Sequence, residues 1–206
     1  MKKLIVSLGL ALTLSFGATF DEGVEAANKG DYKTALIIFE DLAYKNDAQA
    51  QNELGIIYKN GYGVKQDYNK AKEWFQKAAA QGYALAQYNL GVMYSNGKGV
   101  KQDYKKAIEL YKKAATQGYA DAQFNLGIMY ENGKGVKQDY FKAKEWYEKA
   151  AAQGDALAQN NIGFLYVNGQ GVKQDFKKAK EWFGKACDGG EQMGCDNYKL
   201  LNQKGY

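Results

Sequence analysis

Apolar residues recur along most of the chain at the spacing of amphipathic helices. Within residues 84–96, Ala86, Leu90 and Tyr94 fall at i, i+4 and i+8. Residues 104–117 carry a second apolar stripe, which consists of Ala107, Leu110, Tyr111 and Ala114. Because residues three and four apart share one face of a helix, the pattern predicts two consecutive amphipathic helices.

Turn residues separate the two predicted helices. Asn96 and Gly97 tolerate the left-handed backbone conformation that ends many helices. Asp103 suits the N-cap of the second helix, because its carboxylate accepts hydrogen bonds from the unpaired amides at a helix start. Gly118 then closes the second helix. The sequence therefore predicts a complete helix–turn–helix unit.

This unit repeats with a period of 36 residues, which Asn89, Asn125 and Asn161 mark. Such a period is typical of a solenoid, in which each unit buries its apolar face against its neighbours. We therefore expect an all-α fold, an α-solenoid that forms a right-handed superhelix of tandem helix–turn–helix repeats. The predicted boundaries are 19–49 for an N-terminal repeat, 50–85, 86–121, 122–157 and 158–193 for four full repeats, and 194–206 for a C-terminal capping helix.

A glycine stands inside the first helix of every full repeat, at Gly55, Gly91, Gly127 and Gly163. Glycine in a helix interior costs about 1 kcal/mol relative to alanine. Its recurrence predicts a close approach of the second helix at this position.

The first 18 residues have the composition of a secretory signal peptide. Lys2 and Lys3 precede an apolar run over Leu4–Phe16, and small residues then allow cleavage after Gly17 or Ala18. The run is too short to cross a membrane comfortably, although a retained anchor is the alternative. We expect an exported protein, secreted or periplasmic, with no membrane span in the mature chain.

The composition excludes several classes of functional site. All 28 basic residues are lysine, histidine is absent, and there are two cysteines. Without histidine, neither a zinc site of the His/Cys type nor a Ser–His or Cys–His catalytic pair is possible. Nucleic-acid recognition relies strongly on arginine, which the chain also lacks. We therefore expect no metal, no cofactor and no nucleic acid, and a monomer that binds a protein or an extended peptide.

Residues 50–193 carry the repeated motif A-x-x-x-L-G-x-x-Y-x-x-G-x-G-V-x-x-D-x-x-K-A. This motif resembles the Sel-like repeat, a branch of the tetratricopeptide superfamily. Asp21–Gln49 resembles an ordinary tetratricopeptide unit. In tetratricopeptide proteins, the Asn before the Leu-Gly pair lines the concave groove and contacts peptide ligands, so the resemblance implies a peptide-binding groove here.

The segment from Lys185 to Asp196 is similar to the Helicobacter cysteine-rich proteins. In those proteins, cysteines eight residues apart cross-link each repeat, and some members are described as penicillin-binding proteins or weak β-lactamases. Here only Cys187 and Cys195 form such a pair, and two cysteines in an exported chain favour a structural disulfide. The other full repeats have Ala79 and Gln87, Ala115 and Gln123, and Ala151 and Gln159 at these positions.

A polar strip on the first helices is the candidate binding surface. Asn89, Asn125, Asn161 and Asn197 form a ladder at one repeat position, which Glu53 interrupts. An asparagine amide both donates and accepts hydrogen bonds, so it suits an extended peptide backbone of any sequence. The residues beside the ladder vary, as a specificity surface should, and they are Asn52, Tyr88, Phe124, Asn160 and Asp196. The alternative is that these amides only satisfy neighbouring turns.

Ser95-Asn96-Gly97-Lys98 formally matches the S-x-x-K motif of serine β-lactamases. That motif needs both side chains on one helical turn, whereas Asn96-Gly97 is where the helix should end. Neither an S-D-N nor a K-T-G partner segment is present. Carboxylates on the second helices lie among lysines, as in a solvated face, and they are Glu73, Glu109, Glu145 and Glu181.

These observations favour an exported repeat scaffold that binds proteins or peptides through its concave face and has no catalysis of its own. The alternative, implied by resemblance alone, is a penicillin-binding protein or a weak β-lactamase. A third hypothesis is a passive structural protein or a secreted factor that acts on host proteins.

Overall fold

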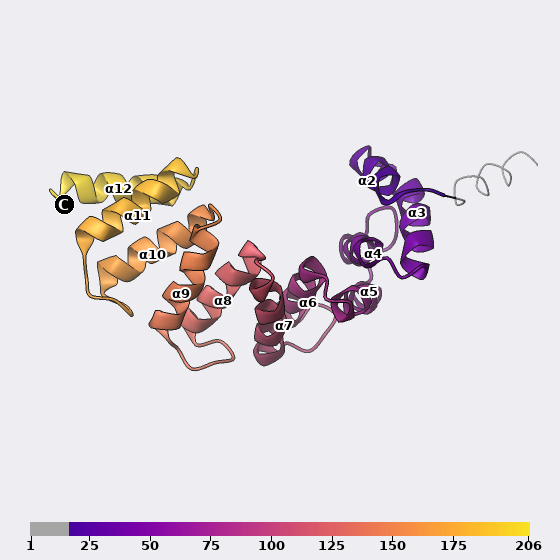
Figure 1. Cartoon of the computed structure of the whole chain (residues 1–206), viewed down its shortest axis with the longest axis horizontal. Coiled ribbons are helices and arrows are strands. Elements are labelled where there is room, and N and C mark those ends of the chain that lie inside the picture. Colours follow the sequence, from indigo (N-terminus) through magenta and orange to yellow (C-terminus); the bar gives the residue numbers. More distant parts are fainter. Residues whose placement is uncertain (1–16) are drawn as a thin grey trace, which may run out of the picture. The chain divides into compact units, whose positions relative to one another are not determined.

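The computed structural model describes residues 17–206, and within them every regular element is an α-helix (Figure 1). The helices are α2 Phe20–Asn28, α3 Tyr32–Tyr44, α4 Ala48–Asn60, α5 Tyr68–Ala80, α6 Ala84–Asn96, α7 Tyr104–Thr116, α8 Ala120–Asn132, α9 Tyr140–Ala151, α10 Ala156–Asn168, α11 Phe176–Asp188 and α12 Gln192–Gln203. Within this part of the chain, no helix is long and apolar enough to cross a membrane. The predicted signal peptide falls almost entirely on residues 1–16, outside the described residues.

The helices alternate between two roles within the repeats. We name α2, α4, α6, α8, α10 and α12 the first helices, and α3, α5, α7, α9 and α11 the second helices. The predicted helix over 84–96 is α6 without change, and the predicted helix over 104–117 ends one residue earlier, at Thr116. The predicted C-terminal helix begins at Gln192, two residues before its predicted boundary. The predicted α-solenoid of helix–turn–helix repeats is confirmed.

The predicted helix boundaries have the expected capping chemistry. Asp103 accepts a hydrogen bond from the backbone N–H of Lys106 at 3.0 Å, and Gly97 ends α6 with a left-handed φ of 69°. An aspartate caps the equivalent helices in the same way, at Asp67, Asp139 and Asp175. The repeated Asp and Asn-Gly signals thus set the start of each second helix and the end of each first helix.

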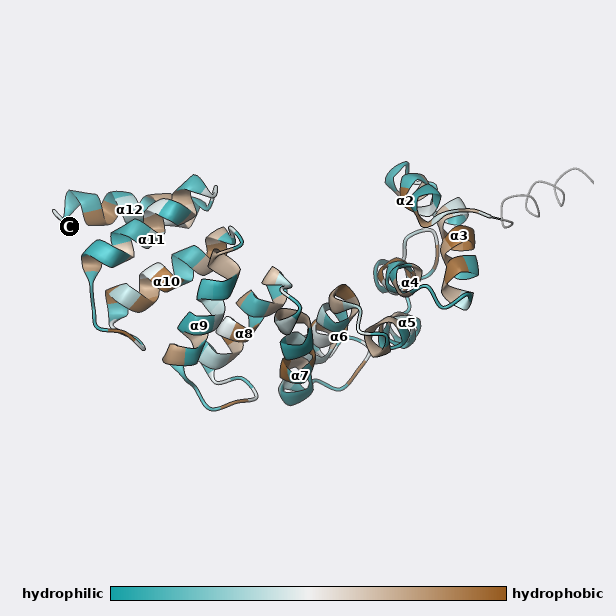
Figure 2. Ribbon diagram, viewed as in Figure 1, coloured by the Kyte–Doolittle hydropathy of each residue, from teal (hydrophilic) through white to brown (hydrophobic). Residues whose placement is uncertain are grey.

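The chain divides into two compact units, residues 17–102 and residues 103–206 of the described part. Phe39, Leu54 and Ile57 lie in the core of the first unit. Tyr147 and Ile162 lie in the core of the second. Hydrophilic and hydrophobic residues alternate along individual helices, as amphipathic helices require (Figure 2). Each unit builds its own apolar interior, and each is described below by itself.

The glycines inside the first helices make room for an aromatic ring of the following second helix. A Cβ atom on Gly127 would lie 2.3 Å from the Tyr147 ring. A Cβ atom on Gly55 would lie 2.5 Å from the Phe75 ring, and Gly163 has the same relation to Phe183. The predicted close approach is confirmed in these repeats, and an aromatic side chain fills the space.

A hydrogen bond links the end of each second helix to the next first helix. Gln51 Nε2 donates to the carbonyl of Ala43 at 3.2 Å, eight residues earlier. Gln87, Gln123 and Gln159 form the same bond with Ala79, Ala115 and Ala151. We name this contact the glutamine clamp. At its position after α11, Cys187 and Cys195 form the predicted disulfide, with the Cα atoms 4.4 Å apart. The covalent bond therefore replaces a hydrogen bond that the other repeats use.

Candidate protein-binding surface

All nine predicted binding residues lie on first helices, where the repeat brings them to equivalent positions. They are Asn52 and Glu53 on α4, Tyr88 and Asn89 on α6, Phe124 and Asn125 on α8, Asn160 and Asn161 on α10, and Asn197 on α12. Within each unit, we name these residues and their neighbours on the same helices the first-helix face. Asn52, Asn89 and Asn160 are buried, with exposed fractions of 0%, 8% and 3%. The other six are half-buried.

Each buried asparagine forms a hydrogen bond with an asparagine of a neighbouring repeat. In the first unit, Asn89 Nδ2 donates to Asn52 Oδ1 at 3.1 Å. In the second unit, Asn197 Nδ2 donates to Asn160 Oδ1 at 3.4 Å. Each bond runs from the ladder position of one repeat to the residue before that position in the preceding repeat. These amides therefore join successive repeats, and the half-buried positions are the ones most open to a ligand.

Glu53 places a carboxylate on the first-helix face of the first unit. Asn52 Nδ2 donates to Glu53 Oε1 at 3.1 Å. Burial raises the pKa of the Glu53 carboxyl above its usual range, and the hydrogen bond from Asn52 opposes that rise only in part. The phenol of Tyr83 lies near enough for the Glu53 charge to add to the effect of burial in raising the pKa of Tyr83. Glu53 is thus a partly desolvated charge beside an amide and an aromatic ring.

Glu131 places a second carboxylate on the same face in the second unit. The hydroxyl of Tyr147 donates to Glu131 Oε2 at 2.5 Å, although the Tyr147 residue is fully buried. Phe124 packs beside it, with ring centroids 5.7 Å apart and ring planes tilted by 42°. Burial raises the pKa of the Tyr147 phenol well above its usual range, and Glu131 adds to the rise while a hydrogen bond with Asn161 opposes it. Three helices, α8, α9 and α10, therefore contribute to one polar cluster.

Sequence reasoning missed Glu131 and Tyr147 as members of this surface. Glu131 follows the predicted binding residue Phe124 by seven positions, so both lie on one face of α8. Tyr147 stands where two other full repeats have Phe75 and Phe183 and one has Tyr111. A buried tyrosine hydroxyl needs a hydrogen-bond partner. The available signal was a hydroxyl at a core position where two of the four full repeats have phenylalanine.

The Ser95 and Lys98 pair lacks the geometry of a serine β-lactamase motif. Ser95 lies in the last turn of α6, and the left-handed Gly97 ends the helix before Lys98. Gln102 Nε2 donates to the Ser95 carbonyl at 2.8 Å, and Gln66, Gln138 and Gln174 form the same turn contact in the other full repeats. The segment is therefore a repeated turn, and its serine and lysine do not share a helical turn.

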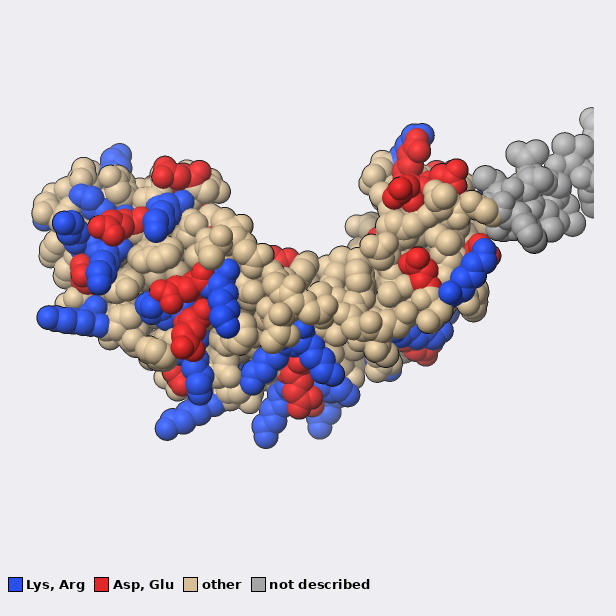
Figure 3. All heavy atoms as spheres, viewed as in Figure 1, with Lys and Arg blue, Asp and Glu red and all other residues tan. Residues whose placement is uncertain are grey.

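The charged residues divide unequally between the two kinds of helix. The first helices carry seven carboxylates and two lysines, whereas the second helices carry fifteen lysines and eight carboxylates. In the second unit, charged side chains gather over α7, α9 and α11 (Figure 3). Glu73, Glu109, Glu145 and Glu181 are all exposed, as predicted for a solvated face. The lysine-rich surface thus belongs to the second helices.

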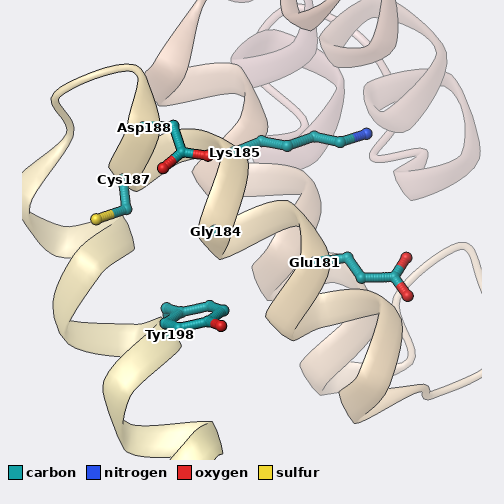
Figure 4. Close-up of a pocket in the computed structure, with 6 residues that line it drawn as sticks. All are labelled: Glu181, Gly184, Lys185, Cys187, Asp188 and Tyr198. Carbon is teal, nitrogen blue, oxygen red and sulfur yellow. The ribbon is translucent and has the colours of Figure 1, made fainter.

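A separate hollow of about 460 Å³ lies between α11 and α12 (Figure 4). Its lining consists of Glu181, Gly184, Lys185, Cys187, Asp188 and Tyr198. Gly184 opens the hollow, because the other full repeats carry Gln76, Lys112 or Glu148 at that position. The side chains of Glu181 and Lys185 point away from α12, and the Lys185 ammonium lies 4.2 Å from the centre of the Trp182 ring. The charged groups diverge, so we assign the hollow no part in binding.

Comparison with known proteins identifies the repeats. The chain matches the Sel1 repeat over residues 48–83, 84–119, 120–155 and 156–191, each segment beginning at the start of a first helix. No curated protein matches the chain.

Several solved structures are similar. The protective antigen c5321 of uropathogenic Escherichia coli strains, which displays an SLR fold, is 41% identical with a TM-score of 0.81. The match covers 82% of this chain but only 36% of that one. A Sel1 repeat protein from Oxalobacter formigenes is 32% identical with a TM-score of 0.80, covering 91% and 85% of the two chains. Helicobacter pylori cysteine-rich protein B is 30% identical with a TM-score of 0.49, covering 61% and 95%. With four matching repeats over most of its length, the chain belongs to the Sel1 repeat family.

Proposed function

We propose that the protein is an exported scaffold that binds proteins or extended peptides through its first-helix face and catalyses no reaction of its own. Sel1 repeats generally mediate protein interactions. The observation that carries the proposal is the contrast within each repeat. The aspartate caps and helical glycines recur in every full repeat, while the positions beside the asparagine ladder and those near the end of each first helix differ between repeats. A fixed scaffold with a variable surface is how repeat proteins acquire specificity.

Residue 131 and its equivalents illustrate this variability. The four full repeats carry Lys59, Ser95, Glu131 and Val167 at this position, near the end of each first helix. The backbone there is held in the same way in every repeat, by the glutamine that bonds its carbonyl. The scaffold thus presents four different side chains from equivalent places, and this supports a recognition role.

Photo-crosslinking tests which face binds. A photoreactive amino acid replaces Asn125 on the first-helix face of α8 or the exposed Glu145 on α9. After irradiation of cells that produce the protein, we expect protein adducts from position 125 and none from position 145. Adducts from position 145 alone, or equal adducts from both, would contradict the proposal. The same purified protein should leave the β-lactam nitrocefin unhydrolysed, and turnover would contradict the absence of catalysis.

We also propose that the protein acts outside the cytoplasm. The pattern of residues 1–18 supports export, and the Cys187–Cys195 disulfide is typical of oxidising compartments. N-terminal sequencing of the protein recovered from the envelope or the medium should begin at Ala18 or Thr19. A chain that begins at Met1 and remains in the cytoplasm would contradict this.

A further inference from the structure

Glu131 and the residues around it on the first-helix face indicate what kind of side chain a partner could place there. Phe124, Ile128 and Glu131 follow one another at i, i+4 and i+7 on α8. The first two side chains are half-buried and pack on the core of the second unit. Asn161 on α10 lies close enough to the Tyr147 hydroxyl to lower the pKa of that group. An apolar stripe therefore ends at a carboxylate, next to an amide.

One hydrogen bond holds the Glu131 side chain and another holds its backbone. Its side chain accepts the hydrogen bond of the buried Tyr147 hydroxyl. Its backbone carbonyl accepts a hydrogen bond from Gln138 Nε2 at 2.7 Å. A side chain held this way loses little conformational entropy on binding, which favours its use in recognition.

None of the ion pairs within residues 17–206 includes this carboxylate. Lys134, the nearest lysine in sequence, extends over the Tyr104 ring at 5.9 Å from its centre. Lys142 pairs with Asp139 at 3.3 Å. The Tyr147 hydroxyl is a neutral donor, so it fixes the charge without cancelling it. A half-buried anion thus remains without a counter-charge on a helix face that carries few cations.

We propose that Glu131 is a specificity-determining residue that receives a lysine or arginine side chain of the protein partner. The methylene stem of such a side chain would lie along Phe124 and Ile128, and its cationic head would meet the carboxylate. Long basic side chains cover apolar surface with their stems in this way, and an aromatic ring adds cation–π attraction. This inference rests on the proposed binding function and names the chemistry of one contact.

A basic side chain fits better than the alternatives. An acidic group would be repelled by Glu131 and would find its complement among the lysines of the second helices. A neutral group would cover the carboxylate without supplying a charge, and a buried unpaired charge is strongly unfavourable. Only a cation both compensates the charge and uses the apolar stripe.

Peptide binding tests the inference. The probe is a fluorescein-labelled nine-residue peptide of alternating lysine and alanine, and a second peptide replaces lysine with glutamate. Fluorescence anisotropy gives Kd for the wild type, for Glu131→Gln and for the matched control Glu145→Gln. The amide oxygen that Glu131→Gln introduces can still accept the Tyr147 hydrogen bond, so circular dichroism and thermal unfolding should match the wild type.

We expect Glu131→Gln to weaken binding of the lysine peptide about tenfold, the effect of losing roughly 1.4 kcal/mol of charge pairing. Glu145→Gln makes the same change in net charge and should alter Kd less than twofold. Because the chain carries a net charge of +5, general electrostatic attraction would favour the glutamate peptide instead. Tyr147→Phe should weaken lysine-peptide binding less than Glu131→Gln does, because the carboxylate remains but is no longer held.

Equal effects of Glu131→Gln and Glu145→Gln would overturn the inference, as would binding of the lysine peptide that neither change affects. Either result leaves the proposed function standing if position 125 still gives protein adducts in cells. Absence of those adducts, with lysine-peptide binding that depends on Glu131, would contradict the proposed function and support the charge contact alone.

Discussion

The first-helix and second-helix faces of the same repeats hold their polar groups in different ways. On the first helices, Asn52, Asn89 and Asn160 are buried and bonded, and Glu131 is fixed by a buried hydroxyl. On the second helices, lysines and carboxylates lie mainly in solvent. Exposed ion pairs contribute little to stability, whereas a buried polar group that loses its partner is costly. Polar groups of the first-helix face therefore contribute to stability, whereas those of the second-helix face contribute little.

The largest expected difference in stability between the two faces is at two helical glycines. Gly127→Ala places a Cβ atom 2.3 Å from the buried Tyr147 ring, whereas Gly184→Ala meets only the exposed Tyr198 ring at 3.3 Å. Overpacking should destabilise the first variant, and the gain in helix propensity should make the second neutral or slightly more stable. We expect the two unfolding free energies to differ by about 2–4 kcal/mol in urea denaturation. Equal stabilities would show that the first-helix interior can repack freely.

The next largest expected effect on stability is at the connection from α11 to α12. The Cys187–Cys195 disulfide closes a short loop, and its loss should cost about 2–3 kcal/mol by loop-closure entropy. Cys187→Ala with Cys195→Gln installs the residues of the glutamine clamp used by the other repeats. We expect hydrogen exchange of α12 amides to increase when both cysteines become alanine, and to be partly restored with glutamine.

If the glutamine variant protects α12 amides no better than the double alanine variant does, the glutamine clamp cannot take the place of the disulfide. The measurement reports local opening of α12, which is appropriate because repeat stacks open most readily at their ends.

The buried amides should be more sensitive than exposed ones. Asn52→Ala leaves the Asn89 amide without its acceptor and Glu53 without its donor. Loss of one partner in a buried hydrogen bond costs about 1–3 kcal/mol. Gln76→Ala, on the exposed face of α5, should stay within about 0.5 kcal/mol of the wild type. Thermal unfolding followed by circular dichroism compares them, and similar melting temperatures would mean that the Asn52 contacts add nothing to stability.

The sequence predicts the helices and the placement of the binding residues on them, but it does not predict which of their side chains are buried. Aspartate caps, Asn-Gly turns and the 36-residue period determine the helices, because each acts through contacts close in sequence. The nine predicted binding residues were placed correctly on first helices for the same reason. The burial of Asn52 and Asn89 was not predictable, because the bond between them joins residues at different positions of two successive repeats. A strictly repeat-based alignment pairs Glu53 with Asn89 and so misses that bond.

The remaining unpredicted features depend on contacts between neighbouring helices. Tyr147 shares its hydroxyl with Tyr111 at the equivalent position, but its role depends on Glu131 in the preceding first helix. Likewise, the residue types Ala and Gln at the clamp positions do not predict a hydrogen bond. It follows only from the fold, which brings the alanine carbonyl and the glutamine amide together. Side-chain pairs that cross from one helix to the next require the three-dimensional arrangement.

The smallest expected effect concerns the ionisation of Glu53. Its carboxyl pKa in the folded protein lies above the usual value near 4.5, chiefly because of burial. A raised carboxyl pKa means that the folded state binds the proton more tightly than the unfolded state does. This contribution to stability is therefore present below about pH 4.5 and is lost as the pH rises through the folded pKa. Glu53→Gln has no such titration, so its stability relative to the wild type should increase between about pH 4 and pH 7.

The matched control is Glu73→Gln on the exposed face of α5, which retains Glu53 and should therefore follow the wild-type pH profile. Unfolding free energies from urea denaturation at several pH values give the three curves, and all other carboxylates cancel in the differences. If Glu53→Gln instead runs parallel to the wild type, the Glu53 carboxylate is as well solvated as a second-helix glutamate. The contrast between the two faces would then hold for the buried amides and for Glu131 but would not extend to the charge on α4.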